Sequence, residues 1–232
     1  MRVDALPGRA TAGAAWALDP GFTPPSPLWM LVGVGGDELA PTGVDLAQEG
    51  PGFVIAGPPK SGRSTSVCAA ARSLLRSGLP LVLVTPKRSP LRELAGEPGV
   101  LGAVQDMTDA APLQELLERA AAGGRYAVVV DDAELVHDTP LDSVLEGVVR
   151  SGVDGGHGLV AAGTTEALTS QYRGFVKEAR RARSGLLLSP QNNAEGELFS
   201  VRLPRAAASG GLGRGLLVRS GELTAVQAVV DE

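Results

Sequence analysis

The sequence predicts an α/β fold in which a parallel β-sheet is flanked by helices. From Phe53 onward, short apolar runs typical of strands alternate with patterns typical of helices. The runs at 81–84 and 127–130 are continuously apolar, as expected of strands that are covered on both faces. The chain has 232 residues, 44% of them hydrophobic, which is enough to bury a sizeable core.

Composition excludes several functional classes. The net charge of −5 gives no overall attraction to nucleic acid, so any contact with a polyanion must be local. Cys68 is the single cysteine, which excludes an internal disulfide framework or a cysteine zinc site and fits a cytosolic setting. No apolar run reaches the roughly 20 residues needed to span a bilayer, and no signal peptide is recognisable.

Residues 1–50 are predicted to form a lead-in to the main domain, 51–232, and to make one globular unit with it. Residues 3–27 are rich in proline and glycine, which predicts an extended surface segment with Trp16 and Phe22 as anchors. Runs at 28–34 and 42–46 flank a turn and predict an N-terminal β-ribbon that leads into the first core strand.

The central motif is the stretch 57–65, Gly-Pro-Pro-Lys-Ser-Gly-Arg-Ser-Thr. It follows the strand-like run 53–56 and opens into a predicted helix at 64–76, which is the order of a phosphate-binding loop. Such a loop points consecutive backbone N–H groups at an anion beside a helix N-terminus. The predicted ligand-binding residues here are Gly57, Lys60, Ser61, Gly62, Arg63, Ser64 and Thr65. The alternative is a Gly/Pro turn that merely begins a helix.

Arg63 departs from the phosphate-loop pattern, which has lysine at this position. A lysine ammonium is compact, whereas the arginine guanidinium is a bulkier planar fork. We therefore expect nucleotide binding to survive and hydrolysis to suffer, and we count Arg63 among the candidate catalytic residues.

A second motif follows the apolar run 127–130, where Asp131 and Asp132 stand at the predicted strand end. An acid at this edge of a parallel sheet can hold the water shell of Mg²⁺, so Asp131 and Ser64 are the predicted metal-associated residues. Asp132 stands where additional-strand ATPases usually have a catalytic glutamate, and Glu134 could take that place only through a rearranged turn. The alternative is that Asp132 and Glu134 cap a turn or face water.

Further elements complete the alternating pattern. A strand at 159–163 ends in Thr164 and Thr165, and if it inserts between the two motif strands, a hydroxyl such as that of Thr164 would sense the terminal phosphate. Otherwise these threonines cap the next helix. Additional helices are expected at 112–122 and from 140 to about 152, a strand at 100–104, and a C-terminal β-hairpin around Ser220–Gly221. The arginines at 180, 181 and 183 are either fingers for a neighbouring nucleotide or polyanion, or part of a charged outer face, which we favour.

At this point the chain resembles a known family. The segments that carry the resemblance are Gly-Val-Asp-Leu at 43–46, the loop at 54–64, Val-Val-Val-Asp-Asp at 128–132 and Gly-Arg-Gly-Leu-Leu-Val at 213–218. Together they resemble an FtsK/SpoIIIE-type motor module. More narrowly, they are similar to the last, degenerate ATPase module of actinobacterial EccC-type proteins of type VII secretion.

The resemblance implies a RecA/FtsK-like P-loop NTPase fold that uses ATP and Mg²⁺. It also implies a hexameric motor with preceding ATPase modules in the same protein, and an exported protein or its C-terminal signal peptide as partner. Such a module is expected in the cytoplasm, at the inner face of the membrane through its parent protein. Family members usually carry an anchor and two or three modules, so we expect this single module to be an excised C-terminal portion.

Three hypotheses follow. The first is a module that binds ATP weakly or without efficient hydrolysis and serves assembly, regulation or substrate docking in a type VII secretion-like motor. The second is a docking module for a partner peptide with a vestigial nucleotide pocket. The third is an active ATPase or DNA translocase, for which the low positive charge favours protein over DNA as the substrate.

Overall fold

A single β-sheet organises the fold. The computed structural model describes residues 5–204 and 211–230. Its strands are β1 (Ala10–Thr11), β2 (Trp29–Gly35), β3 (Ala40–Asp45), β4 (Gly52–Ala56), β5 (Leu81–Val84), β6 (Val100–Val104), β7 (Ala127–Val130), β8 (Gly158–Gly163), β9 (Gly185–Leu188), β10 (Arg214–Arg219) and β11 (Glu222–Val230). Its α-helices are α1 (Ala12–Leu18), α2 (Arg63–Arg76), α3 (Pro90–Glu93), α4 (Ala111–Ala122), α5 (Pro140–Gly155), α6 (Thr165–Ser170) and α7 (Gly174–Arg180), and its 3-10 helices are η1 (Leu94–Gly96), η2 (Ala133–Leu135) and η3 (Asn193–Phe199).

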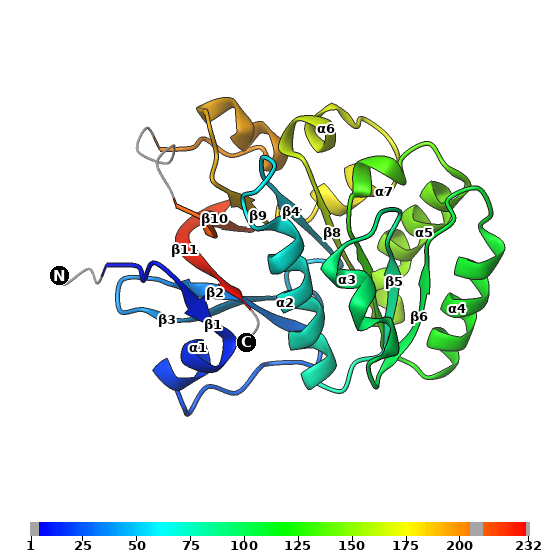
Figure 1. Cartoon of the computed structure of the whole chain (residues 1–232), viewed down its shortest axis with the longest axis horizontal. Helices are drawn as coiled ribbons and strands as arrows, with labels where there is room; N and C mark the ends of the chain where they lie inside the picture. The colour runs from blue at the N-terminus through cyan, green and yellow to red at the C-terminus, as the bar shows by residue number, and fades with distance from the viewer. Residues whose placement is uncertain (1–4, 205–210, 231–232) are drawn as a thin grey trace.

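The strand order is β3-β2-β11-β10-β9-β4-β8-β7-β5-β6, with β1 paired to β11 (Figure 1). The six strands from β9 to β6 pair in parallel, as the alternating pattern predicted. Strand β8 lies between β4 and β7, which places the loop after β4 and the acids after β7 on either side of it. The condition set for Thr164 by the sequence is therefore met.

Helices cover both faces of the parallel strands. Successive residues of a strand point to opposite sides, so each strand contributes side chains to the core on both faces. Val54 and Ala56 belong to the core beneath α5 and α7, whereas Phe53 and Ile55 belong to the core beneath α2. All four side chains are almost fully buried. The two-sided burial explains why the central strands are apolar without alternation.

The predicted N-terminal β-ribbon and C-terminal β-hairpin both form. Strands β2 and β3 pair antiparallel, as do β10 and β11 around Ser220–Gly221. Along the chain the ribbon leads into β4, the first core strand, as the sequence predicts, whereas in the sheet it joins through β11. Strands β3 and β4 follow each other in sequence, yet β2, β11, β10 and β9 separate them in the sheet (Figure 1).

The sequence predicts an extended segment across residues 3–27. That prediction is wrong at residues 12–18. There the chain forms α1, whose first turn is capped by the Thr11 hydroxyl accepting from the Ala14 N–H at 3.2 Å. The high helix propensity of alanine and this cap outweigh the missing periodicity. The predicted anchors Trp16 and Phe22 pack on Trp29, with ring centroids 5.4 and 4.9 Å from that of Trp29.

Other boundaries differ by only a few residues from the sequence-based ranges, for example α4 at Ala111–Ala122 against 112–122. No structure was predicted for the segment after β9, which contains η3. A capping box formed by Asn192 and Glu195 stands at the start of η3. Within residues 5–204 and 211–230, no helix combines the length and the apolar character needed to cross a bilayer.

Candidate phosphate-binding site

The loop between β4 and α2 has the backbone shape of an anion cradle. Lys60 and Gly62 adopt positive φ angles of 66° and 101°, and the Ser61 N–H donates to the Pro58 carbonyl at 3.2 Å. Gly62 is the N-cap residue of α2, so the free N–H groups of the first helical turn lie at the loop. These features create the positive end of a helix dipole beside a tight turn, which favours an anion.

Polar atoms with no partner indicate where a ligand fits. Within the described part of the chain, Ser61 Oγ, the Arg63 NH1 nitrogen and Asp131 Oδ2 are buried and make no hydrogen bond. Buried polar groups normally have partners, so three such atoms around one loop suit an additional polar group. A cavity of about 280 Å³ lies over the loop, lined by Lys60, Gly62, Arg63, Ser64, Thr65 and Leu212. This donor set fits the phosphates of a nucleotide.

Ser64 and Asp131 come together as the sequence predicted. Asp131 directly follows β7 with 3% of its surface exposed, and the Asp132 N–H donates to Asp131 Oδ1 at 3.0 Å. Burial raises the pKa of the Asp131 carboxyl, as does the charge of Asp132, while the Ser89 hydroxyl, the Asp132 N–H and the Ser64 hydroxyl lower it. A carboxylate oxygen and a serine hydroxyl are oxygen ligands of the kind that Mg²⁺ prefers.

Arg63 turns into the protein at the start of α2. Its NH1 nitrogen lies 3.9 Å from Glu134 Oε1, and only 16% and 19% of the two side chains are exposed. The pair is an ion pair at long range, since the distance exceeds that of a hydrogen bond. Glu134 is thus the acid that meets the loop cation.

The turn after β7 explains why Glu134 reaches this position. Asp132 adopts a left-handed conformation, with φ 48° and ψ 48°, and begins η2. The sequence predicts that Glu134 could take the place of the catalytic glutamate only through a rearranged turn, and that role stays a prediction. Asp132 is half-buried and directly follows Asp131 in the chain. Its catalytic role stays a prediction.

Thr164 follows β8 directly, and its N–H donates to Glu134 Oε1 at 3.3 Å. The residue is half-buried, and it shares Glu134 Oε1 with the Arg63 guanidinium. Its expected role as a phosphate sensor stays a prediction. The neighbouring Thr165 hydroxyl is buried without a partner in the described residues.

A second cavity of about 420 Å³ adjoins the loop and was not foreseen from the sequence. It shares Gly62, Thr65 and Leu212 with the cavity over the loop and extends between the N-terminal segment and β11. Its remaining lining residues are Gly8, Arg9, Ser66, Gly213, Gln227, Ala228, Val229 and Val230. The closing Gly-Arg-Gly segment at 213–215 is the part of the sequence that indicates this cavity. The Arg214 NH2 nitrogen donates to the carbonyls of Leu6 and Pro7 and so holds the N-terminal segment beside the C-terminal strands.

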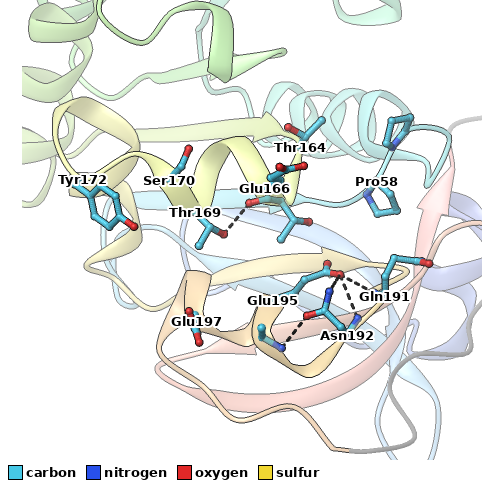
Figure 2. A pocket seen from close by; sticks show the side chains of 13 residues that line it. Pro58, Thr164, Glu166, Thr169, Ser170, Tyr172, Gln191, Asn192, Glu195 and Glu197 are labelled. Atoms are coloured by element: carbon cyan, nitrogen blue, oxygen red, sulfur yellow. Dashed lines mark hydrogen bonds between the residues drawn. The ribbon is translucent and has the colours of Figure 1, made fainter.

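A third cavity, of about 650 Å³, lies on the other side of Pro58 and Pro59, between α6 and η3. Figure 2 shows Pro58 and Thr164 at one end and Tyr172 at the other. Glu166, Glu195 and Glu197 line it, which makes its wall acidic. Glu195 Oε1 accepts from the N–H groups of Gln191 and Asn192 at 2.7 and 3.3 Å, so that carboxylate is already engaged.

The three arginines at the end of α7 are used inside the module. Arg180 donates to backbone carbonyls of α6 and η3, and Arg181 pairs with Glu178 at 2.8 Å. Arg183 donates to the carbonyls of Phe199 and Ser200 at 3.4 and 3.1 Å. Of the two alternatives, the structure favours a structural and surface role over fingers aimed at a nucleotide.

The comparisons with known proteins give the fold. No protein-family model matches the sequence, and neither does any curated protein. Among solved structures, the cytoplasmic domain of EssC matches with a TM-score of 0.77 at 18% identity, over 99% of this chain and 48% of that one. Thermomonospora curvata EccC (ATPases 2 and 3), in complex with a signal sequence peptide, matches with a TM-score of 0.76 at 20% identity, over 99% of this chain and 44% of that one. VirB4 of Thermoanaerobacter pseudethanolicus matches with a TM-score of 0.63 at 13% identity, over 91% and 98%.

At identities of 20% or less, these likenesses show the fold alone. The chain shares the fold of the EssC and EccC structures, and its sheet flanked by helices agrees with the α/β fold that the sequence predicts. It spans less than half the length of the EssC and EccC chains.

Proposed function

We propose that the chain is a nucleotide-binding module of an FtsK/SpoIIIE-type motor, related in role to the EccC modules of type VII secretion, that binds Mg-ATP weakly or without efficient hydrolysis. The observation that carries the proposal is the loop after β4. It combines an intact backbone cradle, a cavity over it and three buried polar atoms that lack partners in the described chain. ATP supplies the anion that this cradle suits, and Mg²⁺ would neutralise it.

In this proposal each residue acts through the atoms that the fold presents. The loop from Gly57 to Thr65 binds phosphates through backbone N–H groups, and the larger cavity beside Gly62 takes the base and sugar. Ser64 and Asp131 hold Mg²⁺. Thr164 senses the terminal phosphate from the end of β8.

Hydrolysis is expected to be feeble for two reasons. Arg63 replaces the compact loop lysine with a broader cation, and this guanidinium already faces Glu134. Asp132, one methylene shorter than glutamate, is the acid left to polarise water. The module would then serve assembly, regulation or substrate docking and would not drive transport by ATP hydrolysis.

The proposed setting is the cytoplasmic face of the membrane, reached through a parent protein. Partners would be the preceding ATPase modules, within a hexamer, and an exported protein or its C-terminal signal peptide. EssC and EccC, with which the chain shares its fold, support this setting. A DNA translocase is disfavoured by the net charge of −5 and by the internal use of Arg180 and Arg183.

A thermal melt with and without excess Mg-ATP tests the proposal. Nucleotide at about 100 times its dissociation constant would stabilise the fold by about 2.7 kcal/mol, which raises Tm by roughly 5–10 °C for a chain of this size. Asp131→Ala should lower the Mg²⁺ dependence of that shift. The variant Arg63→Lys tests whether the guanidinium closes the pocket. Its control is Arg181→Lys, the same change at an exposed residue directly after α7.

The outcomes separate the hypotheses. A shift in the wild-type chain supports nucleotide binding, and slow release of phosphate would then support a degenerate ATPase. A shift in Arg63→Lys alone would mean that Arg63 closes the pocket, and the nucleotide proposal would fail for the natural chain. The absence of a shift in every variant would overturn it as well.

Peptide docking is the second candidate function, and the cavity between α6 and η3 favours it. Tyr172 lies at the end of this cavity away from Pro58 and is 81% exposed (Figure 2). Glu166 and Glu197 give the wall of the cavity a negative charge. An extended peptide with a basic residue matches this wall by charge. One of the solved structures that share the fold is EccC in complex with a signal sequence peptide.

Fluorescence anisotropy with labelled C-terminal peptides of exported proteins would test docking. Tyr172→Ala should weaken binding about tenfold, because an exposed aromatic anchor is lost. Arg173→Ala, its exposed neighbour outside the cavity lining, is the control. Equal binding by both variants, or no binding at all, would count against this cavity as the docking site.

A further inference from the structure

The carboxylate of Glu134 lies among groups that the proposed function assigns to a phosphate. Its Oε1 faces the Arg63 guanidinium at 3.9 Å and accepts the Thr164 N–H at 3.3 Å. Its Oε2 is buried and makes no hydrogen bond to any residue that the structure describes. One carboxylate thus bridges the start of α2 and the end of β8.

Packing holds this carboxylate in place. A Cβ atom added to Gly163 would overlap Glu134 Oε2, so the backbone of β8 lies directly against the acid. Gly163 is fully buried at the end of the strand. The position depends on the left-handed turn at Asp132, which directs η2 back toward the loop.

Electrostatics gives the arrangement a reason. Arg63 is 16% exposed, and a largely buried cation without a counter-charge is costly. Glu134 provides that charge through Oε1, in the way that one oxygen of a phosphate would. Glu134 and a terminal phosphate would compete for the same cation, and the two anions would repel each other.

We propose that Glu134 is a built-in phosphate surrogate that makes the site selective for a nucleoside diphosphate over a triphosphate. The inference rests on the proposed nucleotide-binding function and names its ligand more narrowly. A diphosphate is held by the loop backbone without disturbing Glu134. A triphosphate places its last phosphate against Arg63 and Thr164 and must first displace the carboxylate.

A different role for the same residue makes a different prediction. If Glu134 polarised an attacking water in place of Asp132, Glu134→Gln would abolish turnover and leave the affinity for ATP unchanged. As a surrogate, Glu134→Gln keeps the side-chain volume and an oxygen for the Thr164 N–H but removes the negative charge. The affinity for the triphosphate should then rise.

Isothermal titration of the full chain with Mg-ADP and with Mg-ATP tests the inference. The wild-type chain should bind ADP about tenfold more tightly than ATP, a difference of about 1.4 kcal/mol. Glu134→Gln should tighten ATP binding about tenfold and change ADP binding by less than about twofold. Glu115→Gln, an exposed acid on α4, should change neither constant.

Equal constants for the two nucleotides in the wild-type chain would overturn the inference, and this result needs no variant to fold. A Glu134→Gln variant that changes both constants alike would also overturn it, although nucleotide binding itself would stand. Binding of neither nucleotide to any variant would overturn the proposed function and the inference with it.

Discussion

At Gly57 the chain has no room for a side chain. A Cβ atom there would lie 2.6 Å from Ser61 Oγ and 2.8 Å from the Leu188 carbonyl oxygen, closer than real atoms pack. The residue therefore lets the loop pass tightly between its own serine and the end of β9. This is a requirement of space, and it fixes where the backbone donors at 60–65 lie.

Gly57→Ala should therefore disturb the cradle. We expect a loss of stability of about 1–3 kcal/mol, the cost of forcing extra volume into a packed site, and a weaker response to nucleotide. Thermal melts with and without Mg-ADP would measure both effects. Gly96→Ala is the control, because an added Cβ there meets no described atom within 4 Å. Equal behaviour of the two variants would contradict the steric account.

Cys68 lies on α2 with 7% of its surface exposed, and its thiol is expected to be inert. Burial, followed by the nearby charge of Asp131, raises its pKa from 9.0 to about 12. At about pH 8 this leaves roughly a thousandfold less thiolate than in an unfolded chain, and the thiolate is the reactive form.

Labelling with a thiol reagent checks this expectation. The folded chain should react on the timescale of unfolding, and the chain in denaturant should react at once. Because the folded pKa is the higher one, the thiolate in the folded chain should stay the minor form until the pH approaches 12. Rapid labelling of the folded chain near neutral pH would show that the thiol is accessible.

At the scale of elements, Arg180 at the end of α7 holds α7 against its neighbours. Its half-buried guanidinium donates to carbonyls from more than one element. It donates to the carbonyls of Leu168, Gln171 and Leu198 at 2.9, 3.3 and 2.9 Å. Burial lowers the pKa of Arg180, but its carbonyl partners satisfy the charge. The side chain thereby closes the end of α6 and holds η3 against α7.

Arg180→Ala is expected to cost about 2 kcal/mol, because several carbonyls lose a charged donor. Arg181→Ala, one residue later, should change stability by less than about 0.5 kcal/mol, since its ion pair with Glu178 is exposed. Urea unfolding of the two variants would compare them directly. A similar loss in both would contradict the anchoring role of Arg180.

Helix α5 offers a matched pair of glycines. Gly147 is exposed in the helix interior and has open space where a Cβ would be, so Gly147→Ala should stabilise the chain by about 1 kcal/mol. At Gly152 on the same helix, a Cβ would lie 2.7 Å from the His157 carbonyl oxygen. Gly152→Ala should therefore destabilise the chain. Thermal melts that changed in the same direction for both variants would refute this contrast.

At the scale of the whole molecule, the two ends of the chain are built into one sheet. Strand β11 pairs with β10, β2 and β1, so residues near the C-terminus lie between N-terminal strands and the parallel core (Figure 1). Met30 and Val44 of the lead-in are fully buried in the same core as Phe53 and Leu74. The lead-in and the main domain should unfold together.

Calorimetry tests this cooperation. The full chain should show one unfolding transition, with calorimetric and van't Hoff enthalpies that agree. A chain of residues 51–232 should lose that transition, because it exposes one edge of β11 and opens the core beneath α2. Two separate transitions in the full chain, or an unchanged melt after truncation, would show that the lead-in folds on its own.

The sequence by itself determined the parallel sheet, the turn at 57–65 between a strand and a helix, and the proximity of Ser64 to Asp131. These depend on local pattern: continuous apolar runs specify buried strands, and glycines specify the turn between strand and helix. It missed α1 because seven residues rich in alanine carry no apolar periodicity, and η3 because its cap stands in an irregular segment.

The tertiary structure alone decided three things: the placement of β8 between the motif strands, the joining of the N-terminal ribbon to β11, and the meeting of Glu134 with Arg63. Each brings together residues far apart in the chain, and sequence spacing does not specify which distant strands pair or where a left-handed turn directs an acid. The identity of Arg63 was visible in the sequence. The anion that faces it was set by the way the chain folds.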